Sequence, residues 1–332
     1  MGSEMCIRDR FEARLGAEEM PEKEVHVFCA GYRADEFEEL LQYADHIVFN
    51  SPTQLLRFGP GAKEAGKSVG LRINPECSTQ DGHEIYDPCA PGSRMGTTRA
   101  QWDEAFQKNP ELLDLLEGIH FHTLCEQDSD DLETTLVFVK KHFGDLASRV
   151  KWINFGGGHH ITRPGYDIER LERCIRMAKD EWKVEVYLEP GEAWALNAGF
   201  LLTRVLDVLK NGKTEIAIID ASAACHMPDV LEMPYRPPLL GADDTEEDRI
   251  TVRLGGPTCL SGDVIGDYKF RQLPQYGDIL MFGDMAIYTT CKNNTFNGMP
   301  LPDIWLRRAD NTMQQLTDFG YADFKERLGS RK

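Results

Sequence analysis

The sequence lacks the features that mark secreted and membrane-spanning proteins. Its 332 residues include no apolar run near the ~18 residues that a membrane helix needs, and no charged segment followed by an apolar stretch opens the chain. The nine cysteines form no C-x-x-C pair, and an odd, scattered set is typical of reduced thiols. These absences predict a cytoplasmic protein without structural disulfides.

Basic residues are also scarce. The chain has 37 Lys and Arg against 55 Asp and Glu, a net charge of −18. Nucleic-acid binding needs basic patches, so this balance argues against such a partner. An acidic protein attracts cationic ligands, although acidity also simply aids solubility. The most acidic run, residues 241–249, is expected to be a solvated loop.

The first ten residues, MGSEMCIRDR, show no periodicity. We interpret residues 1–10 as an artefact and leave them out of the fold. Beyond them, apolar segments alternate with helical patterns. Strands are predicted at residues 25–30, 46–50, 69–74, 118–123, 151–158 and 184–191, and helices at 34–44, 51–58, 128–143 and 166–182. Strands joined through helices indicate parallel βα units.

The pattern of predicted elements changes after residue 191. Strands predicted at 200–209, 215–222, 250–256 and 277–282 are separated by turns, which indicates an all-β region from 200 to about 288. Six parallel strands suit a doubly wound sheet, but a (β/α)8 TIM-type barrel needs eight. We therefore predict a barrel at 11–198 that lacks its first two strands, and a mainly β domain of barrel or sandwich type at 199–332.

The stretch WINFGGGHH, residues 152–160, ends an apolar strand in three glycines. After a parallel strand, the bare N–H groups of Gly156, Gly157 and Gly158 can bind phosphate. A dinucleotide-binding loop would instead read G-x-G-x-x-G after the first strand. A plain tight turn is the remaining alternative. Phosphate binding is the favoured interpretation.

The HFH segment places His120 and His122 two residues apart on a predicted strand, so both should point to one face. Such a pair could hold Zn²⁺ in a metal-dependent hydrolase, but further ligands would be required and no spacing selects them. The alternative is one packed and one exposed histidine. We favour no metal.

Three further segments carry reactive side chains. LEPGEA ends a strand with Glu189, at the rim where barrel enzymes place their catalytic groups. GGPTCLSGDVIGDY is a turn-rich loop in which Cys259 is expected to be exposed, beside Asp263 and Asp267. Tyr288 lies in a predicted strand-to-loop stretch. None of these segments identifies a function alone.

Together these segments resemble the fold-type III pyridoxal-phosphate decarboxylases, which act on ornithine, arginine or diaminopimelate. GIHFHTLCEQ, NFGGGHH, EPGEA, DASAACHMPDVLEMPYRP, GPTCLSGDVIGDY and YTTCKNNTFNG are most similar to the carboxynorspermidine decarboxylase branch. The resemblance runs from about Phe11 to the C-terminus. It implies pyridoxal 5'-phosphate as cofactor and carboxynorspermidine or carboxyspermidine as substrate.

The resemblance also implies residue roles. The glycine loop and Tyr288 would bind the cofactor phosphate, with Gly191 nearby. His122 would stack on the pyridine ring, and Glu189 would pair with the protonated ring nitrogen, which strengthens the electron sink. Cys259 would return a proton to the substrate carbon as general acid, from the partner subunit of a homodimer with shared sites.

The substrate contacts are expected from charge. Carboxylates suit the distant amines of a polyamine, and Glu232 and Asp263 are the candidates, with Asp267 in place of Asp263 as the alternative. Arg94 could bind the substrate carboxylate or lie on the surface. Another diamino-acid decarboxylase, such as one for diaminopimelate, and a non-catalytic cofactor-binding homologue stay open.

One departure from the family concerns the Schiff-base lysine, which in the family lies near the end of the first barrel strand. No such strand is found here, and residues 11–20 resemble the helix after the second strand. We therefore expect the printed chain to lack this lysine and to be inactive. Lys292 is the only lysine near a site motif.

Overall fold

The computed structural model divides the chain into two compact units, residues 1–194 and 195–332. It describes residues 5–7, 9–80, 87–242 and 249–329. Residues 1–4 and 8 of the segment interpreted as an artefact, and 243–248 of the acidic run, lie outside the described residues.

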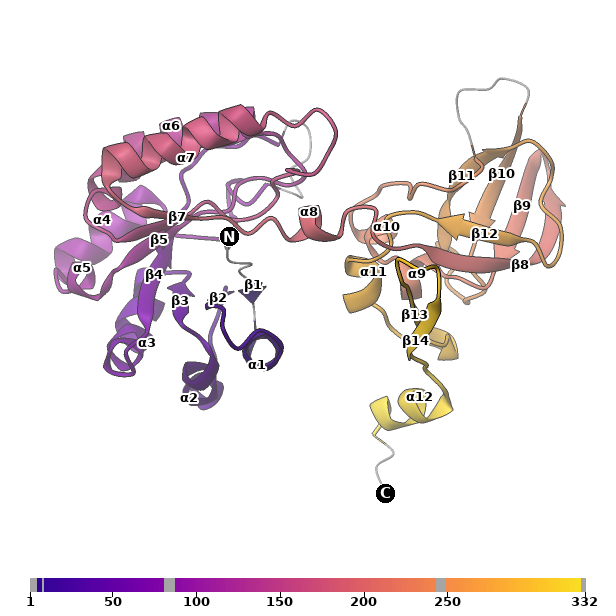
Figure 1. The fold of residues 1–332 in the computed structure, drawn as a ribbon, viewed down its shortest axis with the longest axis horizontal. Coiled ribbons are helices and arrows are strands. Elements are labelled where there is room, and N and C mark those ends of the chain that lie inside the picture. Colours follow the sequence, from indigo (N-terminus) through magenta and orange to yellow (C-terminus); the bar gives the residue numbers. More distant parts are fainter. Residues whose placement is uncertain (1–4, 8, 81–86, 243–248, 330–332) are drawn as a thin grey trace. The chain divides into compact units, whose positions relative to one another are not determined.

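The first unit is built on a seven-stranded parallel sheet whose strands follow one another in chain order (Figure 1). The strands are β1 (Met5–Ile7), β2 (Val25–Cys29), β3 (His46–Phe49), β4 (Ser68–Arg72), β5 (Gly118–His120), β6 (Trp152–Asn154) and β7 (Glu185–Tyr187). β2 to β7 confirm the six predicted strands. β1 lies inside the segment that the sequence analysis left out of the fold, and it pairs with β2.

Helices connect these strands: α1 (Arg10–Glu19), α2 (Ala34–Tyr43), α3 (Pro52–Glu64), α4 (Arg99–Lys108), α5 (Leu112–Leu115), α6 (Ser129–Ala147) and α7 (Ile168–Trp182). Local signals fix their starts. The Ser51 hydroxyl accepts from the Gln54 N–H at 3.3 Å, and Pro52 opens α3. Among the described helices, none is long and apolar enough to cross a membrane.

The two faces of the sheet differ in chemistry. Residues such as Val27, Ile47 and Leu71 point to the outer face and join one large apolar core with the helices, which line this side of the sheet (Figure 1). The alternate residues form the inner face. Because strand side chains alternate, Gly70 and Arg72 on β4 share that inner face.

Trp152 fills the inner face at the amino ends of the strands. A Cβ on Gly118 would lie 2.0 Å from its ring and one on Gly70 would lie 2.4 Å from it, so only glycine fits at either position. His26 and His46 stack beside it with ring centroids 3.9 Å apart. The bulky groups therefore occupy the amino end, and the polar side chains gather at the carboxyl end.

The second unit contains a five-stranded sheet in the order β11-β10-β9-β8-β12. The strands are β8 (Leu201–Asn211), β9 (Thr214–Ile219), β10 (Ile250–Gly255), β11 (Val264–Phe270) and β12 (Ile279–Phe282). Within this sheet, β9 and β10 pair in parallel, and the other described pairs are antiparallel. The apolar core of the second unit includes Val205, Val252, Leu254 and Phe282.

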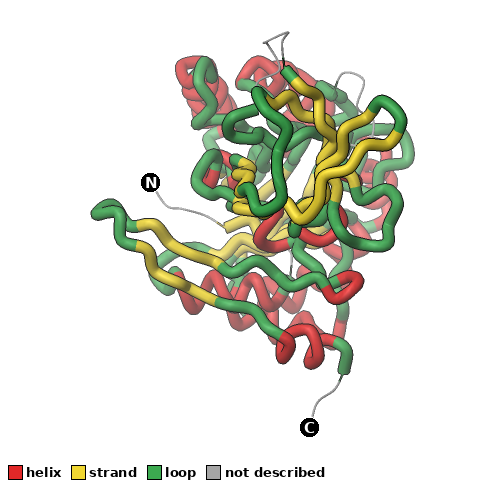
Figure 2. Tube along the Cα trace, turned by 90° about the vertical axis from the view of Figure 1, so that its right-hand side faces the viewer, coloured by secondary structure: helices red, strands yellow, loops and turns green. Residues whose placement is uncertain are grey.

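This unit is less purely β than predicted. The short helices α9 (Ala223–His226) and α10 (Asp229–Glu232) follow β9, and α11 (Tyr288–Cys291) replaces the predicted strand at Tyr288. β11 begins inside the segment predicted as a loop, residues 255–268, and extends two residues beyond it. Figure 2 shows β13 (Ile304–Arg307) and β14 (Met313–Thr317) as an extended two-stranded ribbon that precedes α12 (Tyr321–Arg327). The ribbon and α12 were not predicted.

Candidate active site

Polar side chains of the first unit gather at the carboxyl ends of β4 to β7. Arg72, His120 and Asn154 occupy neighbouring register positions on β4, β5 and β6. All three are buried. Glu189 follows β7 and adds a carboxylate. Alternation puts Arg72, His120 and Asn154 on the inner face, above the layer that Trp152 fills.

Glu189 is the centre of this group. The residue is 7% exposed, and its carboxylate accepts from Asn154 Nδ2 at 2.8 Å through Oε1. His120 Nε2 lies 3.3 Å from Oε2. A buried carboxylate is stable only when donors or cations compensate for lost water. The site therefore holds a negative charge in a fixed place, suited to a cationic ring nitrogen.

The glycine loop packs against the segment that follows β5. Gly156 and Gly158 have φ values of +73° and +79°. A Cβ on Gly158 would lie 2.1 Å from the Leu124 carbonyl oxygen, and one on Gly156 would lie 2.4 Å from that of Phe121. Backbone conformation and close packing thus require glycine here, whatever binds to the loop.

Gly157 places the loop beside two predicted site residues. A Cβ there would lie 2.6 Å from the Glu189 carbonyl oxygen and 3.1 Å from His122 Cε1. The His122 ring therefore borders the loop. Gly191 begins α8 (Gly191–Ala195), and its N–H donates to the same Glu189 carbonyl at 2.8 Å. The first unit thus brings together every cofactor residue predicted within it.

The prediction that His120 and His122 lie on one strand was wrong. β5 ends at His120, so strand alternation does not reach His122. His120 is fully buried against Glu189, whereas His122 is half-buried. Two His and carboxylate groupings in the described residues could hold a metal, Glu24–His26–His46 and Glu126–His160–Glu192. Neither includes His120 or His122.

Arg72 and Asn154 were missed by the sequence analysis. The Arg72 guanidinium lies 4.5 Å from the centre of the Phe28 ring and donates to the His122 carbonyl at 3.2 Å. Its side chain therefore anchors the backbone of His122. Strand alternation could have identified both residues, because each lies two positions after a residue on the inner face of the sheet.

The second unit holds the other predicted residues, and Asp263 is the most constrained. It is 4% exposed. Its Oδ1 accepts from Ser222 Oγ at 3.0 Å and Ala223 N at 2.7 Å, and its Oδ2 accepts from Thr258 Oγ1 at 2.6 Å. The carboxylate ties the loop before β11 to the start of α9. This arrangement contradicts the prediction of a substrate contact and gives Asp263 a structural role.

Asp267, the alternative to Asp263, is exposed and binds Arg253 through both oxygens, at 2.7 and 3.0 Å. The hydrogen bond from Arg253 lowers the pKa of Asp267. This pairing gives Asp267 a partner within its own sheet. Asp267 is therefore open to solvent but already paired with a cation.

Cys259 is exposed, as predicted, and its backbone N–H donates to Asn297 Oδ1 at 2.9 Å. Tyr288 begins α11 with 57% of its surface exposed. Both side chains thus face outward from the second unit, where a ligand or another chain can reach them.

Glu232 ends α10 and is paired with Lys292, whose Nζ lies 2.7 Å from Oε2. Lys292 also binds Asp229. Arg94 is exposed, and Asn50 Nδ2 donates to its carbonyl at 2.8 Å. Among the described residues, none forms an ion pair with the Arg94 side chain. Its guanidinium is therefore available to an anion.

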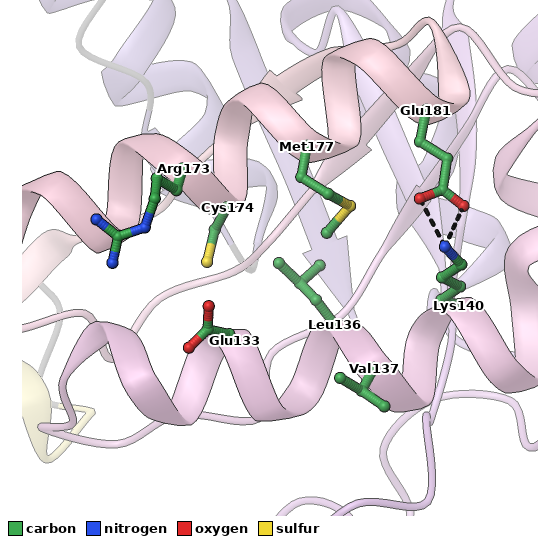
Figure 3. Close-up of a pocket in the computed structure, with 8 residues that line it drawn as sticks. All are labelled: Glu133, Leu136, Val137, Lys140, Arg173, Cys174, Met177 and Glu181. Carbon is green, nitrogen blue, oxygen red and sulfur yellow. Dashed lines mark hydrogen bonds and ion pairs between the residues drawn. The ribbon is translucent and has the colours of Figure 1, made fainter.

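A shallow hollow between α6 and α7 lies on the outside of the first unit (Figure 3). Lys140 and Glu181 form an ion pair across it at 2.8 Å. Cys174 lies at its base, and burial raises the pKa of this thiol to about 11. None of the predicted site residues lines this hollow.

Comparison with known proteins places the chain in a family. A model described as "Pyridoxal-dependent decarboxylase, C-terminal sheet domain" matches residues 28–286. A carboxynorspermidine/carboxyspermidine decarboxylase of Campylobacter jejuni is 39% identical over 328 residues, covering 96% of this chain and 83% of the relative. The chain belongs to the pyridoxal-dependent decarboxylases. Their cofactor is pyridoxal phosphate.

Two further comparisons agree. A carboxyaminopropylagmatine decarboxylase of Synechocystis is 40% identical over 320 residues, covering 96% of this chain and 81% of the relative. The crystal structure of the Campylobacter jejuni carboxynorspermidine decarboxylase, complexed with norspermidine, superposes with a TM-score of 0.85 at 37% identity. The superposition covers 97% of this chain and 85% of the chain in that crystal structure. The parallel sheet followed by a β-sheet domain is thus the architecture of this decarboxylase.

The first unit fits pyridoxal phosphate in its donors and its charge. The glycine loop presents backbone at a strand end, where a phosphate can bind. The buried Glu189 carboxylate offers a counter-charge for a protonated pyridine nitrogen. The His122 ring borders the loop between these two groups.

Proposed function

We propose that this chain carries the cofactor and substrate contacts of an enzyme that removes CO₂ from carboxynorspermidine or carboxyspermidine to give norspermidine or spermidine in polyamine biosynthesis. The observation that carries the proposal is the buried Glu189 carboxylate, held by Asn154 and His120 beside the glycine loop. The names of the relatives at 39% and 40% identity support a carboxylated polyamine as substrate.

The cofactor supplies an electron sink for the bond to the departing carboxyl group. Glu189 holds a proton at the pyridine nitrogen, which keeps that sink strong. The glycine loop binds the phosphate through the N–H groups of Gly157 and Gly158, with Tyr288, because the N–H of Gly156 donates to Asn154 Oδ1. His122 stacks on the ring. These residues hold the cofactor in one orientation, so that the reaction occurs only at the bond to the departing carboxyl group.

The second unit supplies the substrate contacts in this proposal. Glu232 binds the distal ammonium group of the polyamine, and Arg94 of the first unit binds a carboxylate. Cys259 donates the proton that replaces CO₂ on the substrate carbon. An exposed Cys259 suits a head-to-tail homodimer in which each chain completes the site of the other.

Two broader features belong to the same proposal. The sequential order of β1 to β7 and the polar groups at the carboxyl ends of the strands support most of a (β/α)8 barrel. Eight of the nine cysteines, those at positions 29, 77, 89, 125, 174, 225, 259 and 291, are free, which supports a reducing compartment such as the cytoplasm.

Binding of reaction products tests the substrate without requiring turnover. Calorimetry would compare norspermidine, spermidine and lysine on protein saturated with pyridoxal phosphate. We expect norspermidine or spermidine to bind at least about tenfold more tightly than lysine, because a distal ammonium gains a charge-assisted hydrogen bond. Tighter binding of lysine would replace the proposal with a diaminopimelate decarboxylase.

A further inference from the structure

Asn154 links the two halves of the candidate cofactor site. It lies on β6, two residues before the glycine loop, and is 1% exposed. Its Nδ2 donates to Glu189 Oε1 at 2.8 Å, and its Oδ1 accepts from Gly156 N at 2.8 Å. One planar amide therefore contacts both the carboxylate and the loop.

A backbone bond closes this connection into a ring. Glu189 N donates to the Gly156 carbonyl oxygen at 2.9 Å. Gly156 thus donates to Asn154, Asn154 donates to Glu189, and Glu189 donates back to Gly156. Neither the loop nor the carboxylate can shift without breaking one of these bonds.

The position requires a side chain that offers both a donor and an acceptor, as the amide does. Gly156 N needs an acceptor, and an ionised Glu189 needs a donor. An ionised aspartate would accept from Gly156 but would repel Glu189, and an apolar residue would leave both buried groups unsatisfied.

We propose that Asn154 is a positioning residue that keeps Glu189 ionised and fixed relative to the phosphate-binding loop. This inference rests on the proposed function of the site. It assigns to Asn154 the coupling between the counter-charge for the ring nitrogen and the backbone that receives the phosphate.

Asn154→Asp tests the inference through pH, because a protonated carboxyl has the same donor and acceptor as the amide. The control is Asn211→Asp, which makes the same change at an exposed end of β8. Binding of pyridoxal phosphate would be followed by equilibrium dialysis and by absorbance between pH 5.5 and 8.5 on the full chain. The variant should bind at least about tenfold more weakly at pH 8 and should recover as the introduced carboxyl takes up a proton.

Wild-type affinity of Asn154→Asp across this range, or a loss that is the same at every pH, would overturn the inference. If Asn154→Asp does not fold, Asn154→Ser removes only the reach to Glu189 and should weaken binding with a changed cofactor absorbance. An unchanged affinity and spectrum in that variant would also overturn it. Absence of binding by the wild-type chain would instead overturn the proposed function.

Discussion

Lys292 Nζ lies 2.7 Å from Glu232 Oε2, and the same ammonium group binds Asp229. Burial lowers the pKa of Lys292, but its hydrogen bonds to the two carboxylates outweigh that effect and raise it overall. The cluster of Asp229, Glu232 and Lys292 therefore carries two negative charges and one positive charge near neutral pH. One unit of negative charge is left for a cationic ligand.

Glu232→Ala should weaken binding of norspermidine more than binding of lysine. The variant removes the surplus charge, and Lys292 and Asp229 then neutralise each other. We expect a loss of about tenfold or more for norspermidine, the size of one charge-assisted hydrogen bond. Calorimetry measures both ligands, with Glu326→Ala on the exposed face of α12 as control. Equal losses for the two ligands would remove Glu232 from the distal contact.

Gly158→Ala should destabilise the protein far more than Gly165→Ala. Both glycines have positive φ, at +79° and +89°, but a Cβ at 165 meets nothing within 4 Å. The control therefore carries only the backbone cost of about 1 kcal/mol, whereas the collision with the Leu124 carbonyl should add at least about 2 kcal/mol. Urea unfolding measures the difference, and similar losses would show that the loop packing is wrong.

Stability should fall as the pH drops, in part through His159 of the segment after the glycine loop. Burial lowers the pKa of His159 to about 4 from 6.5. The unfolded chain therefore binds a proton that the folded chain does not, so stability is full above about pH 6.5 and is lost towards pH 4, by up to about 3 kcal/mol. His159→Gln removes the one group that takes up this proton on unfolding, so the free energy of unfolding should depend less steeply on pH. Urea unfolding from pH 4.5 to 8 measures this dependence. His142→Gln is the half-buried control, and an identical slope in both variants would contradict the assignment.

Borohydride reduction of the 332-residue chain with pyridoxal phosphate should label no single lysine stoichiometrically. Lys63 and Lys151 both bind Glu117, which precedes β5 at the amino edge of the sheet, opposite Glu189. Lys292 is held as a cation between two carboxylates, which makes it a poor nucleophile. Mass spectrometry of peptides would locate any adduct. One fully labelled lysine, or normal turnover, would refute the expectation of an inactive chain.

The sequence predicts the parallel sheet well because its strands are short apolar runs rich in β-branched residues. β1 was missed because three residues in a charged segment carry no periodic signal. The β13–β14 ribbon was missed for a related reason: β14 is almost wholly exposed, so no alternation of apolar and polar residues is required.

The candidate site was predicted in part. The glycine loop, His122 and Glu189 form one group, as the motifs indicate. Asp263 was interpreted wrongly because a motif position does not reveal the donors that surround a carboxylate. Asn154 and Arg72 were missed because an isolated polar residue within a strand gains its meaning only from the neighbours on adjacent strands.

The affinity of the chain for pyridoxal phosphate, compared with that of Glu189→Gln, tests the central claim most directly. Glutamine can still accept from Asn154 but carries no charge, so the fold is retained while the counter-charge for the ring nitrogen is lost. Equilibrium dialysis at pH 8 should give one cofactor per wild-type chain and an affinity at least about tenfold lower for the variant. No saturable binding by the wild-type chain, or equal affinities for both proteins, would contradict the account.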